Sequence, residues 1–352
     1  MTGKEHFTSI IKKQSDRPGF WHGSPHRDST EKLYSYFNVS NDFELGLKLS
    51  SVCRFVSPEA CGYWKRTDYP MFDHLNKAKY IDVAKTSLGM AGALADCEDP
   101  KEVNDYHWPH LEDVDFTTTL SEIDKTVEAG QAVLSGTWGS IFSNTWNYFG
   151  MENCFIKMHT HPEVVKAVTG HIADFYLAAI EKLFSLAGKK IDAVFIGVDM
   201  GSQQDLLISP ECFEQFLLPF LKKLINQAHE YGYYLVLHSC GSVYRIIPQL
   251  IEAGVDALHP IQALAANMDA ETLAKNFNGK IVFCGGVDTQ RVLPFGSPQD
   301  VSDEVRRLQK LLGPNYIVSP SHETILPNVK PENVRAMVDA ANIPDSTEAV
   351  PY

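Results

Sequence analysis

Residues 191–203 read IDAVFIGVDMGSQ, an apolar run that ends in an aspartate and a glycine turn. Runs of the same kind, ending in polar or reactive side chains, return three more times, as YYLVLHSC (233–240), KIVFCGGVD (280–288) and YIVSPSHE (316–323). Such short runs, rich in Val, Ile, Leu and Phe, are typical of strands buried on both faces of a parallel sheet. Two plainer runs, 131–135 and 257–261, fit the same description.

Helical patterns separate these runs. Ser209 suits a helix N-cap before Pro210, and apolar residues then recur every three or four positions until Gly232, forming one continuous stripe. Further helices are expected over residues 162–187, 243–253, 302–312 and 331–341. The alternation predicts an α/β fold, either a (β/α)8 barrel or an open doubly wound sheet.

Two observations favour the barrel. The dinucleotide-binding fingerprint G-x-G-x-x-G is missing, and reactive side chains follow four separate strands at the end where barrel active sites are built. We therefore predict a single domain over residues 1–352, a (β/α)8 TIM barrel whose regular part spans residues 126–341. Residues 1–125 are less regular and are expected to supply an N-terminal helical extension and the early strands.

Charge and cysteine content narrow the classes of function. The 352 residues include 31 Lys and Arg against 44 Asp and Glu, a net charge of −13, which disfavours binding to nucleic acid. No apolar run reaches the roughly 18 residues of a membrane helix, and the first twenty residues lack a signal-peptide core. We expect a cytoplasmic protein without nucleic-acid or membrane partners, whose seven cysteines are reduced, bind metal or pack in the core.

The sharpest local signal is His238 and Cys240, an imidazole and a thiol two residues apart at a strand end. One nitrogen and one sulfur ligand suit zinc. Cys284 and His322, at other strand ends, are the candidates for further ligands, with Glu323 as an oxygen ligand. The alternative is that His238 is a hydrogen-bonded residue of the barrel mouth and Cys240 a small buried apolar side chain.

Two aspartates follow strands in glycine-containing turns. Asp199 is a candidate acid or base, or caps its own turn, and Gln203 in the same loop is a candidate substrate contact. Asp288 follows Gly285 and Gly286, which let a ligand approach the backbone closely. Its two interpretations, ligand contact and helix N-cap, have equal support.

Aromatic side chains near the expected mouth are candidates for a pocket wall, although such stretches also form plain core. Trp138, Phe142 and Trp146 follow the strand at 131–135. Trp21 and His22 follow the first expected strand and lie in another mouth loop. All five are predicted to contact the substrate.

Four motifs in order resemble the uroporphyrinogen decarboxylase superfamily, with the resemblance running from about residue 135 to residue 341. They are DMGSQQDLLISPE (199–211), HSCGSV (238–243), CGGVDTQ (284–290) and KPENVRAM (330–337). The resemblance implies a (β/α)8 barrel and one of two chemistries. True uroporphyrinogen decarboxylases use no metal and hold the substrate carboxylates with an arginine-rich loop. The corresponding stretch here reads FWHGSPHR (20–27) and lacks the arginine pair.

The other branch comprises zinc- and cobalamin-dependent methyltransferases, whose zinc is held by a His-x-Cys pair and a later cysteine. His238 and Cys240 match the pair, but the later region reads SPSHE (319–323), so His322 or Cys284 would stand in. This branch implies a methyltransferase with Zn²⁺ and a corrinoid (cobalamin) carrier, acting on a small methylated compound or thiol. Its expected partners are a small-molecule methyl donor or acceptor, a corrinoid protein and a second copy in a homodimer.

Two alternatives stay open. In a metal-free decarboxylase acting on a tetrapyrrole or other carboxylated substrate, Asp199 would stabilise the intermediate while His238 and Cys240 only line the cavity. A corrinoid- or tetrapyrrole-binding protein without turnover is the non-enzymatic alternative. Bound metal separates the methyltransferase from the decarboxylase, and turnover separates both from a binding protein.

Overall fold

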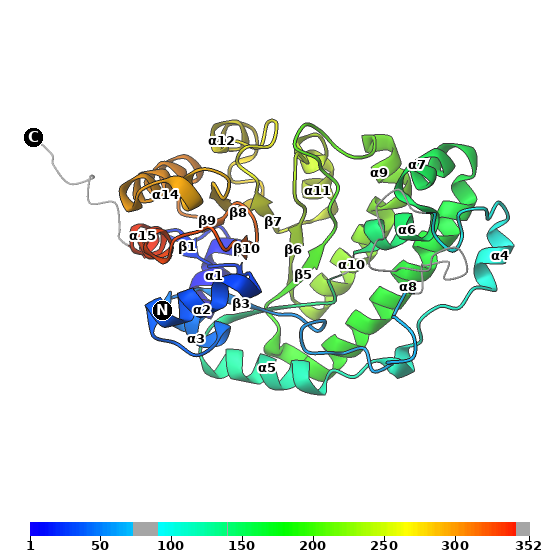
Figure 1. The fold of residues 1–352 in the computed structure, drawn as a ribbon, viewed down its shortest axis with the longest axis horizontal. Helices are drawn as coiled ribbons and strands as arrows, with labels where there is room; N and C mark the ends of the chain where they lie inside the picture. Colours follow the sequence, from blue (N-terminus) through cyan, green and yellow to red (C-terminus); the bar gives the residue numbers. More distant parts are fainter. Residues whose placement is uncertain (73–90, 139, 343–352) are drawn as a thin grey trace, which may run out of the picture.

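The computed structural model describes residues 1–72, 91–138 and 140–342. Its centre is a curled, TIM-barrel-like sheet of eight parallel strands (Figure 1), so the predicted α/β class is confirmed. In spatial order the strands are β1 (Gly19–Phe20), β9 (Tyr316–Pro320), β8 (Val282–Val287), β7 (Ala257–Ile261), β6 (Tyr234–His238), β5 (Ala193–Gly197), β4 (Ala132–Ser135) and β3 (Cys53–Val56).

The two ends of this sheet approach each other. β1, from the start of the chain, pairs with β9 near its end (Figure 1). On its other side, the backbone N–H of Val52, just before β3, donates to the carbonyl of Phe20 in β1 at 2.8 Å. The curl turns one face of the sheet inward, and alternate side chains such as Phe195 and Val236 form an interior cluster there. Helix α1 (Gly3–Ile11) adds Phe7 and Ile10 to this cluster.

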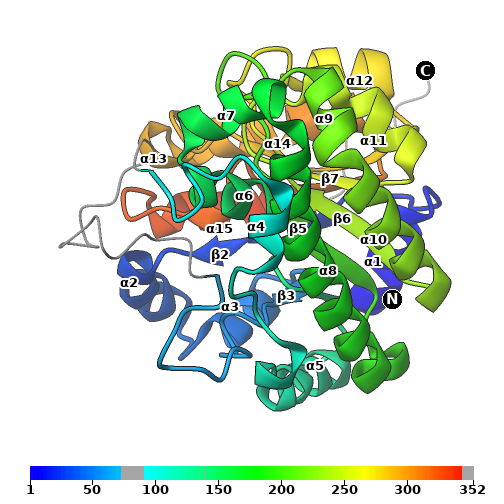
Figure 2. The same cartoon turned by 90° about the vertical axis from the view of Figure 1, so that its right-hand side faces the viewer.

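Helices cover the outer face of the sheet. Figure 2 shows α8 (Pro162–Ala187), α10 (Leu218–Tyr231) and α11 (Ile247–Ala253) over β5 and β6. The other helices are α2 (Arg27–Phe37), α3 (Asp42–Lys48), α4 (Pro100–Asn104), α5 (Thr117–Glu128), α6 (Ile141–Phe149), α7 (Met151–Thr160), α9 (Pro210–Phe216), α12 (Ala270–Phe277), α13 (Val292–Phe295), α14 (Pro298–Leu312), α15 (Pro331–Asn342) and the short turns η2 (Leu111–Asp113), η3 (Gly188–Lys190) and η4 (Tyr244–Ile246). No helix in the described ranges is long and apolar enough to cross a membrane.

The helix expected between Ser209 and Gly232 is two helices. Ser209 caps α9 as predicted, its side chain accepting from the Cys212 N–H, and Gly232 ends α10. The break falls at Leu217, which ends α9 and precedes α10 with a φ of −114°. Pro219 explains it, because proline has no N–H to donate to the carbonyl four residues earlier and its ring clashes with that carbonyl. The apolar stripe continues across the break and conceals it in the sequence.

A small second sheet ties the two ends of the chain together near the main one. β2 (Ser24–Pro25) pairs in parallel with β10 (Thr324–Ile325), and the Ser24 N–H donates to the carbonyl of Glu323 at 2.6 Å. Gly23 makes this approach feasible: its φ is +72°, and a Cβ there would lie 2.3 Å from the Glu323 carbonyl oxygen. The HGSP stretch at 22–25 therefore clamps the loop that carries Glu323.

Candidate functional site

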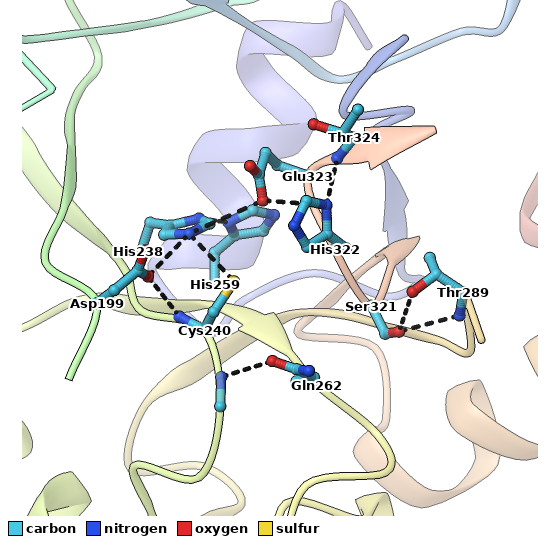
Figure 3. A network of polar contacts seen from close by, with 11 residues as sticks. Asp199, His238, Cys240, His259, Gln262, Thr289, Ser321, His322, Glu323 and Thr324 are labelled. Atoms are coloured by element: carbon cyan, nitrogen blue, oxygen red, sulfur yellow. Dashed lines mark hydrogen bonds and ion pairs between the residues drawn. The ribbon is translucent and has the colours of Figure 1, made fainter. Parts of the chain in front are cut away.

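Three strand ends bring reactive side chains together (Figure 3). His238 is the last residue of β6 with Cys240 two residues beyond, and Asp199 follows β5 by two residues. His322 and Glu323 lie between β9 and β10. Because the strands of the curled sheet are parallel, their C-terminal ends open on the same side, which we call the mouth.

Two glycines hold the loops of Asp199 and Cys240 against each other. A Cβ on Gly241 would lie 2.4 Å from the backbone carbon of Gly201, and one on Gly201 would lie 2.8 Å from the carbonyl oxygen of Cys240. The loops are also joined by the Ser242 N–H, which donates to the carbonyl of Ser202 at 2.7 Å. Only glycine fits at these two positions, because a side chain on either residue would overlap the other loop. The contact holds Asp199 next to Cys240.

We expect Gly241→Ala to destabilise the protein by about 1–3 kcal/mol more than Gly232→Ala, because only the former forces the loops apart. The two glycines have nearly the same φ, +80° and +81°, but nothing lies within 4 Å of a Cβ on Gly232. Both variants carry the cost of positive φ, so their difference isolates the contact. Urea unfolding of the two variants measures it, and equal losses of stability would contradict the expectation.

The side chains at the mouth form a tight cluster around His238. Its Nε2 lies 3.5 Å from the Cys240 Sγ, 3.5 Å from the Asp199 Oδ1 and 3.8 Å from the Glu323 Oε2. Ligand atoms of Asp199, His238 and Cys240 all lie within 4.8 Å of one another, as do those of Cys240, His322 and Glu323. The His238 side chain is 1% exposed, whereas Asp199 is 53% exposed and reachable from outside.

The charges in the cluster oppose a free thiolate. Burial, with Asp199 and Glu323 adding to it, raises the pKa of the Cys240 thiol. Burial also acts to raise the pKa of Asp199, but hydrogen bonding and attraction from His238, the Cys240 N–H and His322 outweigh it, and the pKa is lowered. The carboxylates of Asp199 and Glu323 and the thiol of Cys240 thus lie close together. A bound cation would offset the repulsion between their negative charges.

Glu323 has a side-chain oxygen without a hydrogen-bond partner among the described residues. Among the described residues its Oε2 is buried and has no hydrogen bond, although it lies 3.5 Å from the His322 Nδ1 as an ion-pair contact. That Nδ1 already accepts the Thr324 N–H at 3.1 Å. A buried carboxylate oxygen left without a donor is costly unless a group absent from the chain satisfies it.

The distances suit a tetrahedral metal ion. Zinc bonds of about 2.0–2.3 Å place tetrahedral ligand atoms roughly 3.6 Å apart, close to the separations of His238 Nε2 from Cys240, Asp199 and Glu323. The soft sulfur and imidazole nitrogen are ligands that zinc prefers. The residues present therefore fit a zinc ion, and the Glu323 Oε2, which has no hydrogen bond among the described residues, is the oxygen best placed to bind it.

His259 was not among the residues predicted from the sequence, yet it lies directly behind His238. It is fully buried in β7, in register with His238 in β6, and the two Nδ1 atoms are 3.0 Å apart. Burial above all, with His238 and His322 adding to it, lowers the pKa of His259 well below its usual range, so its ring is neutral. A histidine inside an apolar strand was the available signal.

Two of the predicted aromatic residues lie at the cluster. The Trp138 ring is 4.9 Å from the His238 ring and forms a side wall. Trp21 is buried beneath the site, 5.0 Å from the His259 ring and edge-on to Phe195. The structure therefore places Trp138 beside His238 and Trp21 under the second histidine, and their contact with a substrate stays a prediction.

The structure does not bring Cys284 or Asp288 to the cluster. Cys284 is buried in the interior cluster of the curled sheet and belongs to neither candidate metal group of the described residues, so we drop it from the ligand set. Both oxygens of Asp288 accept backbone N–H groups, from Gln290 at 2.8 Å and Arg291 at 3.2 Å. Of its two interpretations, the cap at the start of the following turn is the observed one.

Four further predictions fall elsewhere. His22 is buried with both ring nitrogens engaged, Nδ1 with Ser51 at 2.8 Å and Nε2 with Asp42 at 3.1 Å, so it holds the clamp and leaves no nitrogen for a substrate. Phe142 and Trp146, one turn apart in α6, pack on Phe155 of α7 in the outer core. The fourth, Gln203, is exposed in the loop after β5, and its role stays a prediction.

The family model of uroporphyrinogen decarboxylase (URO-D) matches residues 93–343, and the chain belongs to this family. A solved structure described as a methyltransferase from Methanosarcina mazei superposes with a TM-score of 0.62 at 17% identity, over 97% of this chain and 98% of that one. At this identity the likeness concerns the fold alone.

Curated relatives point to the methyltransferase branch of the family. Two methylcobamide:CoM methyltransferases MtbA are 25% identical over 154 residues (Methanosarcina acetivorans) and 28% identical over 147 residues (Methanosarcina mazei). The matched parts cover 44% and 42% of this chain, and 42% and 40% of those proteins. A uroporphyrinogen decarboxylase from Salinibacter ruber is 23% identical over 188 residues, 53% of this chain and 49% of that protein. The chain thus spans half or less of each relative.

Proposed function

We propose that the protein is a zinc-dependent methyltransferase that works with a corrinoid carrier and acts on a thiol or a small methylated compound. The observation that carries the proposal is the His238–Cys240 pair with the unpartnered oxygen of Glu323 3.8 Å from the same imidazole nitrogen. Likeness to two methylcobamide:CoM methyltransferases supports the corrinoid link. We assign His238, Cys240 and Glu323 as the zinc ligands.

Glu323 rather than His322 takes the place of the missing later cysteine in this proposal. The Nδ1 of His322 accepts the Thr324 N–H, whereas the Oε2 of Glu323 has no hydrogen bond within the described part of the chain. The pairing of β2 with β10 holds the Glu323 backbone in place. A carboxylate is an ordinary zinc ligand alongside histidine and cysteine.

When bound, zinc would supply Lewis acidity that makes a thiol nucleophilic near neutral pH or a methoxy oxygen a better leaving group. Asp199 is placed to take the proton that a thiol releases: one oxygen accepts the Cys240 N–H at 2.9 Å, and the carboxylate is half-exposed. Its lowered pKa keeps it ionised, so its lone pairs are unprotonated near neutral pH. Trp138 shields His238 from water on one side.

The same stretch that lacks the arginine loop also argues against a uroporphyrinogen substrate. A polyanionic tetrapyrrole needs cationic donors. In the stretch 20–27, His22 is bound by Ser51 and Asp42, and Gly23 packs on the carbonyl of Glu323. The cluster itself adds two carboxylates, which would repel the substrate.

The curled sheet supports a closed (β/α)8 barrel as the setting of this site. The Val52 N–H donates to Phe20, so β1 and the residue before β3 are joined although no strand ladder links them. We take this bond as the seam of the barrel. The mouth is then one continuous ring of strand ends.

Metal analysis with two parallel assays tests the proposal. We expect about one zinc per chain in protein reconstituted with zinc and freed of excess metal. The loaded protein should transfer methyl groups between a methylcobamide and at least one member of a thiol panel, and should leave uroporphyrinogen unchanged under anaerobic reducing conditions. Protein without zinc that decarboxylates uroporphyrinogen at enzymatic rates would overturn the proposal.

A further inference from the structure

The side chain of His259 makes one hydrogen-bond contact among the described residues. It is fully buried in β7, and its ring lies 5.0 Å from Trp21 and 5.4 Å from Phe195. Its Nδ1 lies 3.0 Å from the Nδ1 of His238, while its Nε2 is buried without a hydrogen-bond partner among the described residues. Aromatic rings thus surround an imidazole whose one side-chain hydrogen-bond partner among the described residues is the candidate zinc ligand.

The contact between the two Nδ1 atoms constrains the protons on both rings. Two lone pairs at 3.0 Å would repel and two N–H groups would clash, so one ring donates and the other accepts. If His238 donates, its Nε2 carries a lone pair directed at Cys240, Asp199 and Glu323. If His259 donates, a neutral His238 carries its proton on Nε2 and cannot bind a metal there.

We propose that His259 is the positioning residue of the zinc site: its Nδ1 accepts the Nδ1–H of His238 and thereby presents the Nε2 lone pair of His238 to the ion. This inference rests on the proposed zinc site. Metal-bound histidines generally donate their second ring N–H to an acceptor that fixes tautomer and ring orientation. Here the register of β6 with β7 places the imidazole of His259 where its Nδ1 can be that acceptor.

The surroundings of His259 suit this role. Trp21 and Phe195 pack against its ring and hold it in one orientation. No described group donates to or accepts from its Nε2, so the ring can carry its proton there while Nδ1 stays an acceptor. For His238, the Nδ1 of His259 is the hydrogen-bond partner on the side away from the mouth.

Two variants separate the acceptor from the packing. His259→Phe keeps a ring against Trp21 and Phe195 but has no acceptor, whereas His259→Asn loses the ring but can place an amide oxygen near the Nδ1 position. The measurement is the zinc dissociation constant by chelator competition, with thermal unfolding of each apo-protein as the check on folding. We expect His259→Phe to weaken zinc binding by roughly 10–100-fold and His259→Asn to bind nearly as tightly as the wild type.

Each outcome has a distinct meaning. Equal zinc affinity of wild type and His259→Phe would overturn the inference and leave the zinc site standing. Equal weakening in both variants would also overturn it, because the acceptor that His259→Asn restores would then contribute nothing to zinc binding. A wild type that binds no zinc would overturn the proposed function and the inference with it. If His259→Phe does not fold, two-bond ¹⁵N–¹H spectra of the zinc-loaded wild type decide: we expect His238 protonated at Nδ1 and His259 at Nε2, and protonation of His259 at Nδ1 would overturn the inference.

Discussion

Replacing Cys240 with serine is expected to empty the metal site and lower methyl transfer by about 10³-fold, the effect of losing several kcal/mol of Lewis-acid stabilisation. Cys240 is the residue common to both groups that can hold an ion. A serine hydroxyl stays protonated at neutral pH and is a hard ligand, so it cannot replace the thiolate. Elemental analysis and the transfer assay together measure the effect.

The matched control is Cys61→Ser. Cys61 is also a free, partly buried thiol, but it belongs to neither metal group of the described residues. We expect it to keep both the zinc and the rate. If Cys240→Ser kept full zinc and full activity, Cys240 would not be a zinc ligand and the assignment would be wrong.

Asp199→Asn is expected to lower turnover by roughly 10²–10⁴-fold while zinc content stays the same. The amide oxygen can still accept the Cys240 N–H, now seen at 2.9 Å, so the loop is held in place. The amide cannot take a proton from a substrate thiol. The rate of methyl transfer to a thiol, measured on variant protein whose zinc content has been checked, tests this expectation.

Asp205→Asn is the control for this loop. Asp205 lies six residues further on with nearly the same exposure, 50% against 53%, and its carboxylate pairs with Arg245 instead of the cluster. Its replacement should leave the rate nearly unchanged. An unchanged rate in Asp199→Asn would show that Asp199 is not the base. Loss of zinc in that variant would show that Asp199 is a zinc ligand instead.

The candidate ligands differ in how far the sequence could reveal them. His238 and Cys240 are two residues apart, so a strand end suffices to bring them together. Glu323 and Ser24 are distant in the chain, and their contact follows from the pairing of β2 with β10, which no local pattern announces. Cys284 shows the opposite case: it follows an apolar run as predicted, but β8 continues past it to Val287, so it lies within the strand and not at its end.

His259 and α6 show the same limit for side-chain contacts. The strand at 257–261 was predicted with the correct bounds, yet the partner of His259 depends on the register of β6 and β7. Phe142 and Trp146 were predicted as a pocket wall, and the periodicity of α6 does place them on one face. The residue that this face contacts depends on how α6 packs on α7. Both side chains contact Phe155 of α7.

The α/β class, most strand positions and the His-x-Cys pair follow from the sequence alone, because apolar runs, helical periodicity, caps and strand ends are patterns of neighbouring residues. The composition of the cluster around His238 is a property of the tertiary structure. It requires the curl of the sheet, the stagger between neighbouring strands and the close contact of Gly201 with Gly241. These depend on packing between segments far apart in the chain, and a shift of one residue in strand register would turn His259 away from His238.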